Sequence, residues 1–583
     1  MTPRPTQASR RDFVLMLLFG VIVLASGLGL RDPWAPDEPR FALAARDMLL
    51  SGDWLVPRVG GDLYPDKPPL FMWLIAVGTW FSGSLRIGFM LPSMLASFGV
   101  LCLVTDLARR LWDRNTAIAA GLVLLCTVQF PLQAHTAQID ATLTFLTTLG
   151  LYGLLRHLLL GPAWGWYLLG WAAAGLGVIT KGVGILPLLV LLPWIWARRR
   201  QWTSSPEGSG WHWLGGPVCM LLAIGVWLVP MLIHTWGSLD PDLAAYRDNI
   251  LMKQTMERYA RSWGHIQPPW YFITHVIPFL WLPTILLLPW LSGRWRQALR
   301  ARSMPVFLLL AWIGLVLLFF SATPGKRGVY LLPAVPAFAL LVAPWARELC
   351  ERRGVRRLAL AFTSVVTLLC AGLAAFPLQE SFIDTAAERD ALRLLFAGWA
   401  VIGAVSLLVF GLARAHFGVV TMMAALMIGY GAVLFPLAND LRSGGNIPQA
   451  AEALLGPDET LGLVRWKEQF LLHARRPLVH FGYRRSVEAE EMADALSWLK
   501  QQPGRALVLR EADLLPCFLP ERAMALGVAH RRAWVLVRGD AESGDCQAPA
   551  TPVYHRQYRP ADQYLLSQVT AVSEPAAQKS GPR

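Results

Sequence analysis

Charged residues are scarce in this chain. They make up only 16% of its 583 residues, whereas 55% are hydrophobic. With a mean hydropathy of +0.42, the chain is far too apolar for a soluble protein of this length. It is therefore predicted to cross a membrane many times. The formal net charge of +14 is assigned to short cytoplasmic loops and not to a nucleic-acid surface.

Cysteine is also rare. The chain has seven cysteines and no Cys-x-x-Cys pair, which indicates neither a zinc site nor a disulfide framework. Five of them lie in or beside hydrophobic runs and are interpreted as small apolar residues: Cys102, Cys126, Cys219, Cys350 and Cys370. Cys517 and Cys546 lie in the polar C-terminal part, where they can pair if that part is extracytoplasmic.

Long hydrophobic runs are abundant, and a helix needs about 20 apolar residues to cross a bilayer. The sequence predicts thirteen spans, at about residues 12–30, 87–107, 115–133, 138–158, 164–180, 182–197, 213–236, 270–291, 304–322, 328–345, 357–376, 392–412 and 417–437. No small-residue cleavage site follows the first span, so it is predicted to be a retained anchor. The fold class is an all-α polytopic membrane protein with an added C-terminal domain.

Arginines predict the orientation, because positive residues collect in cytoplasmic connections. They cluster near residues 4–11, 109–114, 198–200, 294–302 and 347–357, which are assigned to the inside. The loops at 31–86 and 237–269 then lie outside, and so does the segment after residue 440. We expect two helices along the membrane surface in the first of these loops, at 39–50 and 68–82.

Unusual polar groups gather in the outer loops and at the outer ends of the predicted spans. The motifs are Pro36-Asp-Glu-Pro-Arg40, Tyr64-Pro-Asp-Lys67-Pro-Pro, Gln138-Ile-Asp140, Thr180-Lys181-Gly182 and Lys326-Arg-Gly-Val-Tyr330. A transporter is expected to place its charges near the bilayer midplane instead, and no internal repeat is evident. The pattern favours a site at the outer membrane surface that acts on a phosphate-bearing lipid.

These motifs resemble those of the bacterial aminoarabinose transferases that modify lipid A. Those enzymes belong to the GT-C class of integral-membrane glycosyltransferases, which includes the protein O-mannosyltransferases. The resemblance covers about residues 12–440 and is strongest in the first outer loop. The chain departs from the family at Asp66, where the family has Glu, and at Arg327-Gly328-Val329, where the family has Leu-Pro-x.

The resemblance implies an enzyme that uses a polyprenyl-phosphate sugar, with Asp37 as catalytic carboxylate. Asp140 is a second catalytic candidate, which would orient the acceptor or a divalent metal ion; no metal ligands are otherwise assigned. Cations would hold the departing phosphate, and arginine can bind two of its oxygens. The candidate substrate-binding residues are Glu38, Arg40, Lys67, Lys181, Arg258, Lys326, Arg327 and Tyr330.

Each candidate also has a plainer interpretation. Asp37 and Asp140 are typical of helix starts, where acids are favoured. Lys67 is typical of an interfacial anchor, and Lys181 of a turn between two spans. Lys326 and Arg327 break the positive-inside pattern, which favours a ligand. Arg258 has other charged residues beside it, and most charges in such a loop are solvated.

The predicted domains are a transmembrane glycosyltransferase domain at 1–440, an extracytoplasmic α/β domain at 441–570 and a disordered tail at 571–583. The stretches from Thr460, Ala506 and Ala533 are typical of short buried strands, and 486–501 of a helix.

The predicted function is inverting transfer of a sugar from undecaprenyl phosphate to lipid A or another extracytoplasmic glycan, in the bacterial inner membrane. Transfer to protein Ser or Thr, and a lipid or sugar transporter, are the alternatives. The expected partners are the lipid-linked donor, the acceptor and membrane lipids.

Overall fold

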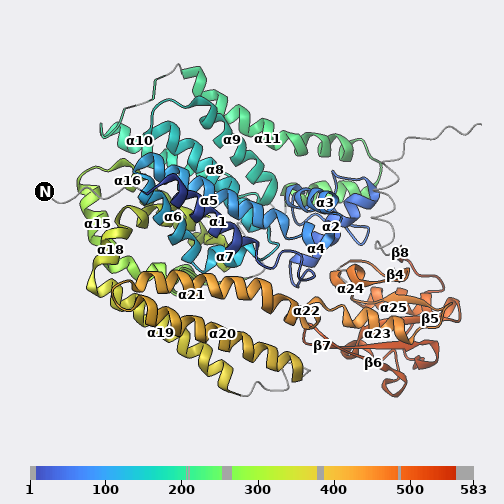
Figure 1. Cartoon of the computed structure of the whole chain (residues 1–583). Helices are drawn as coiled ribbons and strands as arrows, with labels where there is room; N and C mark the ends of the chain where they lie inside the picture. The colour runs from blue at the N-terminus through green and yellow to red at the C-terminus, as the bar shows by residue number, and fades with distance from the viewer. Residues whose placement is uncertain are drawn as a thin grey trace, which may run out of the picture. The chain divides into compact units, whose positions relative to one another are not determined.

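The computed structural model describes residues 8–204, 206–207, 210–252, 265–376, 386–483 and 488–559 (Figure 1). Arg258 and the predicted disordered tail at 571–583 lie outside this range. The chain forms two compact units. The first comprises residues 1–30, 65–71 and 90–437, and the second residues 31–64, 72–89 and 438–583. Most of the predicted first outer loop therefore belongs to the same unit as the C-terminal segment.

The first unit is helical. Its helices are α1 (Arg10–Ala25), α5 (Leu91–Leu111), α6 (Arg114–Cys126), α7 (Gln129–Ala134), α8 (Ile139–Leu159), α9 (Trp164–Lys181), η1 (Leu186–Val190), α10 (Leu191–Arg199), α11 (Gly210–Trp236), α12 (Pro241–Asp248), η3 (Phe272–Val276), α14 (Ile277–Leu280), η4 (Thr284–Leu287), α15 (Leu288–Arg300), α16 (Met304–Ala322), η5 (Gly328–Leu331), α17 (Ala334–Val342), η6 (Ala343–Trp345), α18 (Ala346–Glu351), α19 (Arg353–Ala375), α20 (Ala386–Phe410), α21 (Ala415–Gly429) and η7 (Tyr430–Leu434). Figure 1 shows α19, α20 and α21 running side by side.

Six helices among the described residues are long and apolar enough to cross a membrane, and a bent pair raises this number to seven. The chain is therefore a mostly helical, multi-pass membrane protein. The thirteen predicted spans all coincide with helical segments, but several are interrupted. The stretch at 182–197 divides into η1 and α10, with Pro187 and Pro193 inside it. Proline lacks the N–H that would continue a helix, which accounts for such short pieces.

The span predicted at 270–291 is the bent pair. The segments Phe272–Leu280 and Thr284–Arg300 meet at an angle of 103°. Pro278 lies just before the break and Pro283 within it, and each lacks the backbone donor that a continuous helix would need. A hydrophobic profile registers only apolarity, so it cannot distinguish this bend from a straight span.

Glycines allow α8 and α9 to pack closely. A Cβ atom on Gly153 would lie 2.2 Å from the Trp166 carbonyl oxygen, and one on Gly170 would lie 3.0 Å from the Gly150 carbonyl oxygen. Small residues permit such backbone approach between membrane helices. Because the two helices are antiparallel neighbours joined by a short turn, the start of α8 lies beside the end of α9.

The second unit combines helices with a mixed sheet. Its elements are α2 (Glu38–Ser51), β1 (Arg58–Val59), β2 (Asp62–Leu63), α4 (Leu85–Gly88), α23 (Asn446–Leu454), β3 (Thr460–Leu463), α24 (Glu468–His473), β4 (Leu478–His480), α25 (Glu488–Gln501), β5 (Arg505–Arg510), η8 (Glu511–Asp513), η9 (Pro520–Arg522), β6 (Met524–Ala529), β7 (Arg532–Arg538), η10 (Gly539–Ala541) and β8 (Arg556–Tyr558). The boundaries with the first unit fall within α3 (Leu70–Ser82) and α22 (Phe435–Ser443).

The larger sheet has the strand order β6-β7-β5-β3-β4-β8. Strand β3 pairs in parallel with β4 and β5, and the remaining pairs are antiparallel. The three stretches predicted as strands fall in β3, β5 and β7, and the predicted helix at 486–501 coincides with α25. Each of these strands carries a run of buried residues, which the sequence shows as a short apolar run.

Cys517 and Cys546 form a disulfide with a Cα–Cα distance of 5.1 Å. It closes a loop across a sequence separation of 29 residues. Cys517 packs in the buried core beneath the sheet, with Phe518 and Val537 among its neighbours. The bond therefore ties the connection between β5 and β6 to the segment that follows η10.

Thiol counting tests this disulfide. In denaturant without reductant, a maleimide should label five cysteines of the full chain, and after reduction it should label all seven, as mass spectrometry can count. Replacing both Cys517 and Cys546 with Ser should lower the stability of the second unit by about 3 kcal/mol, because the unfolded loop regains its freedom. Labelling of seven thiols without reductant would contradict the bond.

Asp47 anchors the hairpin β1–β2 to α2. Its Oδ2 accepts a hydrogen bond of 3.2 Å from the Gly61 amide. Gly60 and Gly61 have φ angles of +64° and +87°, a region that side chains rarely adopt. Burial raises the pKa of Asp47 to about 6, although Arg46 and the Gly60 and Gly61 amides act to lower it.

This pKa predicts a pH dependence of folding. Because the pKa is higher in the folded than in the unfolded chain, the contribution of Asp47 to stability is greatest below about pH 4. It declines as the pH rises to about 6, by up to about 3 kcal/mol. Asp47→Asn, which keeps an acceptor for Gly61, should flatten the thermal stability of the protein between pH 4.5 and 7.5. An unchanged slope, with Asp53→Asn as control, would argue against the raised pKa.

Candidate functional site

Three predicted site residues meet in the first unit. The carboxylate of Asp140 and the ammonium of Lys181 form an ion pair, and the Lys181 Nζ lies 4.5 Å from the centroid of the Tyr330 ring. We call Asp140, Lys181 and Tyr330 the Asp140 cluster. The Asp140 side chain is only 5% exposed and that of Lys181 10%, so both charges are largely removed from solvent.

Helix ends support this ion pair. Asp140 lies in the first turn of α8, and Lys181 is the last residue of α9. Acidic groups are stabilised at helix N-termini and basic groups at C-termini. Gly182 ends α9 with a φ angle of +80° and donates a hydrogen bond to the Val178 carbonyl. The expectations of a helix start and a capped turn are thus correct for the backbone, and the two side chains also pair.

Gln129 holds the segment that carries Tyr330, and sequence reasoning missed it. Its Nε2 donates a hydrogen bond of 2.9 Å to the Gly328 carbonyl, and its Oε1 accepts a hydrogen bond of 2.9 Å from Trp281 Nε1. Gln129 therefore links α7, the bent pair and η5. Its signal in the sequence is a glutamine inside a predicted span, because a buried amide needs partners.

The ammonium group of Lys326 is hydrogen-bonded to backbone carbonyl oxygens. Its side chain is buried, at 3% exposure. Its Nζ donates to the carbonyl oxygens of Gln267, at 2.9 Å, and of Thr323. The Lys326 amide also donates 2.9 Å to the His265 carbonyl. These bonds join the 265–267 segment to the turn at 323–326, directly before Arg327.

The remaining candidates of the first unit are less enclosed. Lys67 and Arg327 are half-buried. Tyr330 of the Asp140 cluster also packs against Phe320, with ring centroids 5.4 Å apart. Arg258 lies outside the described residues.

In the second unit, Glu38 is a structural anchor. Its carboxylate forms a two-point ion pair with Arg31, one bond being 2.7 Å from Nη2 to Oε1. The carboxylate also accepts a hydrogen bond of 2.7 Å from the Trp34 amide. The Arg31 guanidinium lies 4.5 Å from the centroid of the Trp34 ring. Both oxygens of Glu38 are therefore occupied within the fold.

Asp37 precedes α2 and differs from its neighbour. Its side chain makes no capping hydrogen bond to the helix, and its Oδ1 lies 3.9 Å from Arg40 Nη1. Arg40 in turn donates from Nε to Glu468 and Tyr483, at 3.0 Å each. Asp37 is therefore the residue at the start of α2, as expected, but its side chain does not cap the helix. The local ion pair with Arg40 is present at a long distance.

Asp37 and Lys326 belong to different units, so the expectation that both serve one site at the outer membrane surface stays a prediction. Within the described ranges, no three His, Cys, Asp or Glu side chains are grouped so as to hold a metal ion. The donors at Asp140 suit an ion pair better than a metal site, because a lysine ammonium has no lone pair to offer.

Curated relatives resemble the chain along most of its length. An undecaprenyl phosphate-alpha-4-amino-4-deoxy-L-arabinose arabinosyl transferase 1 from Pseudomonas fluorescens Pf-5 is 32% identical over 405 residues, which cover 66% of this chain and 69% of the relative. A transferase 2 of the same description from Sodalis glossinidius is 30% identical over 458 residues, covering 75% and 76%.

The fold and one family model agree with these relatives. The crystal structure of ArnT from Cupriavidus metallidurans bound to undecaprenyl phosphate superposes with a TM-score of 0.69 at 23% identity, covering 91% of this chain and 98% of that one. Residues 66–229 match the model of dolichyl-phosphate-mannose-protein mannosyltransferases. The chain belongs to the family of undecaprenyl phosphate-alpha-4-amino-4-deoxy-L-arabinose arabinosyl transferases.

Proposed function

We propose that this glycosyltransferase moves an amino sugar from undecaprenyl phosphate to lipid A or another extracytoplasmic glycan, with inversion at the anomeric carbon. The observation that carries the proposal is the 30–32% identity to arabinosyl transferases over more than two thirds of their length. The Asp140 cluster adds a buried cation and a phenol of the kind that a lipid phosphate requires.

The chemistry explains the residue types. An acceptor hydroxyl attacks the anomeric carbon, the bond from that carbon to the phosphate oxygen breaks, and the hydroxyl proton passes to a carboxylate. The lipid phosphate leaves with an additional negative charge. Cations and hydrogen-bond donors fixed around that phosphate lower the barrier because they are oriented before charge develops.

Asp37 is our choice for the proton-accepting carboxylate. Its neighbour Glu38 already serves Arg31 and the Trp34 amide, so Glu38 is better explained as the anchor that fixes the start of α2. This division of roles between adjacent acids gives the base a rigid backbone, as precise proton transfer requires.

Lys181, Tyr330, Arg327 and Lys67 are our choices for the phosphate. We assign Lys326 and Arg40 to positioning, because Lys326 is bonded to backbone carbonyls and Arg40 to Glu468 and Tyr483. Asp140 would hold Lys181 in place as its counter-ion. Arg258 stays a substrate-binding prediction from the resemblance.

The orientation is part of the proposal. We propose a multi-pass protein of the inner membrane with thirteen membrane-crossing or membrane-embedded segments, and with the 441–570 α/β domain in the periplasm. The Cys517–Cys546 disulfide supports this side, because disulfides persist in the periplasm and are rare in the cytosol.

Transfer to protein Ser or Thr is the second candidate, and the mannosyltransferase model at 66–229 favours it. The purified chain should be supplied with a polyprenyl-phosphate sugar and either lipid A or a Ser/Thr-rich peptide. The proposal expects a mass increase on lipid A alone. Modification of only the peptide would replace it with the second candidate, and no transfer to either acceptor would overturn both lipid A and protein as acceptors.

Asp37→Asn tests the base. The variant should lose roughly 10²–10⁴-fold in kcat while its thermal stability stays near that of the parent, because only the proton acceptor is removed. Asp53→Asn, a carboxylate of the same loop outside the candidate set, serves as control and should keep full activity. Full transfer by purified Asp37→Asn would disprove the assignment.

The Asp140–Lys181 pair calls for a double-mutant cycle. Asp140→Asn or Lys181→Gln alone leaves one buried charge without its counter-ion, which should cost on the order of 3 kcal/mol in stability. The double variant should cost less than the two single losses together. Lys181→Arg, which keeps the charge, should retain most of the stability, whereas Lys181→Gln should raise the KM for the donor. Additive losses, or an unchanged KM, would contradict these roles.

A further inference from the structure

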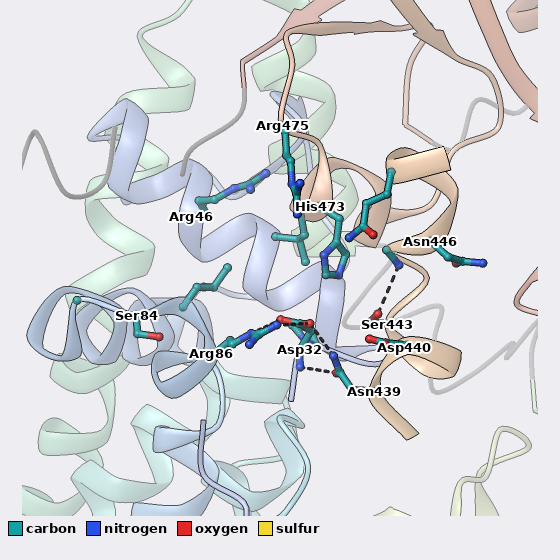
Figure 2. A pocket seen from close by; sticks show the side chains of 16 residues that line it. Asp32, Arg46, Ser84, Arg86, Asn439, Asp440, Ser443, Asn446, His473 and Arg475 are labelled. Atoms are coloured by element: carbon teal, nitrogen blue, oxygen red, sulfur yellow. Dashed lines mark hydrogen bonds and ion pairs between the residues drawn. The ribbon is translucent and has the colours of Figure 1, made fainter. Parts of the chain in front are cut away.

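The second unit contains a polar pocket that none of the predicted site residues lines. Its volume is about 600 Å³, within the range typical of ligand sites. Three stretches far apart in the sequence form it: residues 32–46, which run into α2, the turn at 83–86 before and within α4, and residues 439–475, from α22 to just after α24 (Figure 2). Three arginines and several amides and hydroxyls line this pocket.

One acidic group of the pocket is already neutralised. Asp32 accepts hydrogen bonds from Arg86, at 2.5 Å from Nε and 2.8 Å from Nη2, and from Asn439 Nδ2, at 2.9 Å. Burial alone would raise the pKa of Asp32, but these hydrogen bonds lower it. The Asp32–Arg86 pair therefore contributes little net charge to the pocket.

The opposite side of the pocket is cationic. Figure 2 shows Arg46, from α2, and Arg475, after α24, reaching toward each other, with His473 beside them. Arg46 is 2% exposed and donates 3.1 Å to the Leu471 carbonyl, so its guanidinium is fixed in place. Two guanidinium groups directed to one space repel each other, and an anion between them converts that repulsion into attraction.

We propose that this pocket binds an anionic phosphate group, held mainly by Arg46 and Arg475. Guanidinium groups suit phosphate because each offers two parallel N–H donors. Once Asp32 is paired with Arg86, the lining keeps one carboxylate, that of Asp440, and two guanidinium groups, those of Arg46 and Arg475. The same chemistry serves free phosphate and the headgroup of an anionic lipid. The site is independent of the sugar transfer proposed above.

The test measures binding to the purified full chain. Calorimetry with inorganic phosphate addresses the free anion, and native mass spectrometry with added phosphatidylglycerol or phosphatidylcholine addresses the lipid. Arg475→Gln removes an exposed side chain and should weaken anion binding about tenfold. Asp440→Asn removes the competing charge and should strengthen it. Arg532→Gln, an exposed arginine of β7 outside the pocket, is the matched control and should change nothing.

The results of these binding measurements distinguish free phosphate from a lipid headgroup as the ligand. Saturable phosphate binding that responds to Arg475→Gln supports a free-anion site. Binding of phosphatidylglycerol alone, with the same response and without phosphatidylcholine binding, supports a headgroup site. The proposal is overturned if neither probe saturates, or if Arg475→Gln and Asp440→Asn leave binding as the control does, because the pocket is then only a solvated polar surface.

Discussion

The buried ion pair of Asp140 and Lys181 constrains the rest of the first unit. Two charges withdrawn from solvent are costly unless they stay together, so α8 and α9 must keep their register. Glycines on both helices permit the close backbone approach that this register needs. Tyr330 then packs against the ammonium of Lys181, and Gln129 holds the turn that carries Tyr330. A chain of contacts thus fixes one end of the helical unit.

Similar residues have different roles because their partners differ. Lys181 pairs with a carboxylate and faces an aromatic ring, whereas Lys326 donates hydrogen bonds to backbone carbonyls. Adjacent acids divide in the same way, since Glu38 binds Arg31 and Trp34 while Asp37 lies 3.9 Å from Arg40. A residue whose side chain is bonded within the fold, such as Glu38 or Lys326, restricts the motion of the residue next to it. The proposed site consists of the groups that these anchors position.

The second unit shows how distant segments assemble around polar groups. Asp47 secures the hairpin that precedes Tyr64, and Asp62 accepts from the Tyr483 amide at 2.6 Å. Asp32 gathers Arg86 and Asn439 beside the polar pocket. Carboxylates here act as acceptors that join loops to helices, which is why this unit recruits residues from the first loop as well as from the C-terminal segment.

The sequence by itself determined the membrane class and the family, and it proposed the residue types of the candidate site, because apolarity and short motifs are local properties. It also predicted α2, α25 and three strands, whose caps and buried runs are local too. Only the tertiary structure decided that Lys181 pairs with Asp140, that Lys326 and Glu38 are anchors, that Gln129 joins three segments, and that the span at 270–291 bends by 103°. These outcomes depend on partners distant in the chain, and a buried charge or amide takes its role from the partner that the fold brings to it.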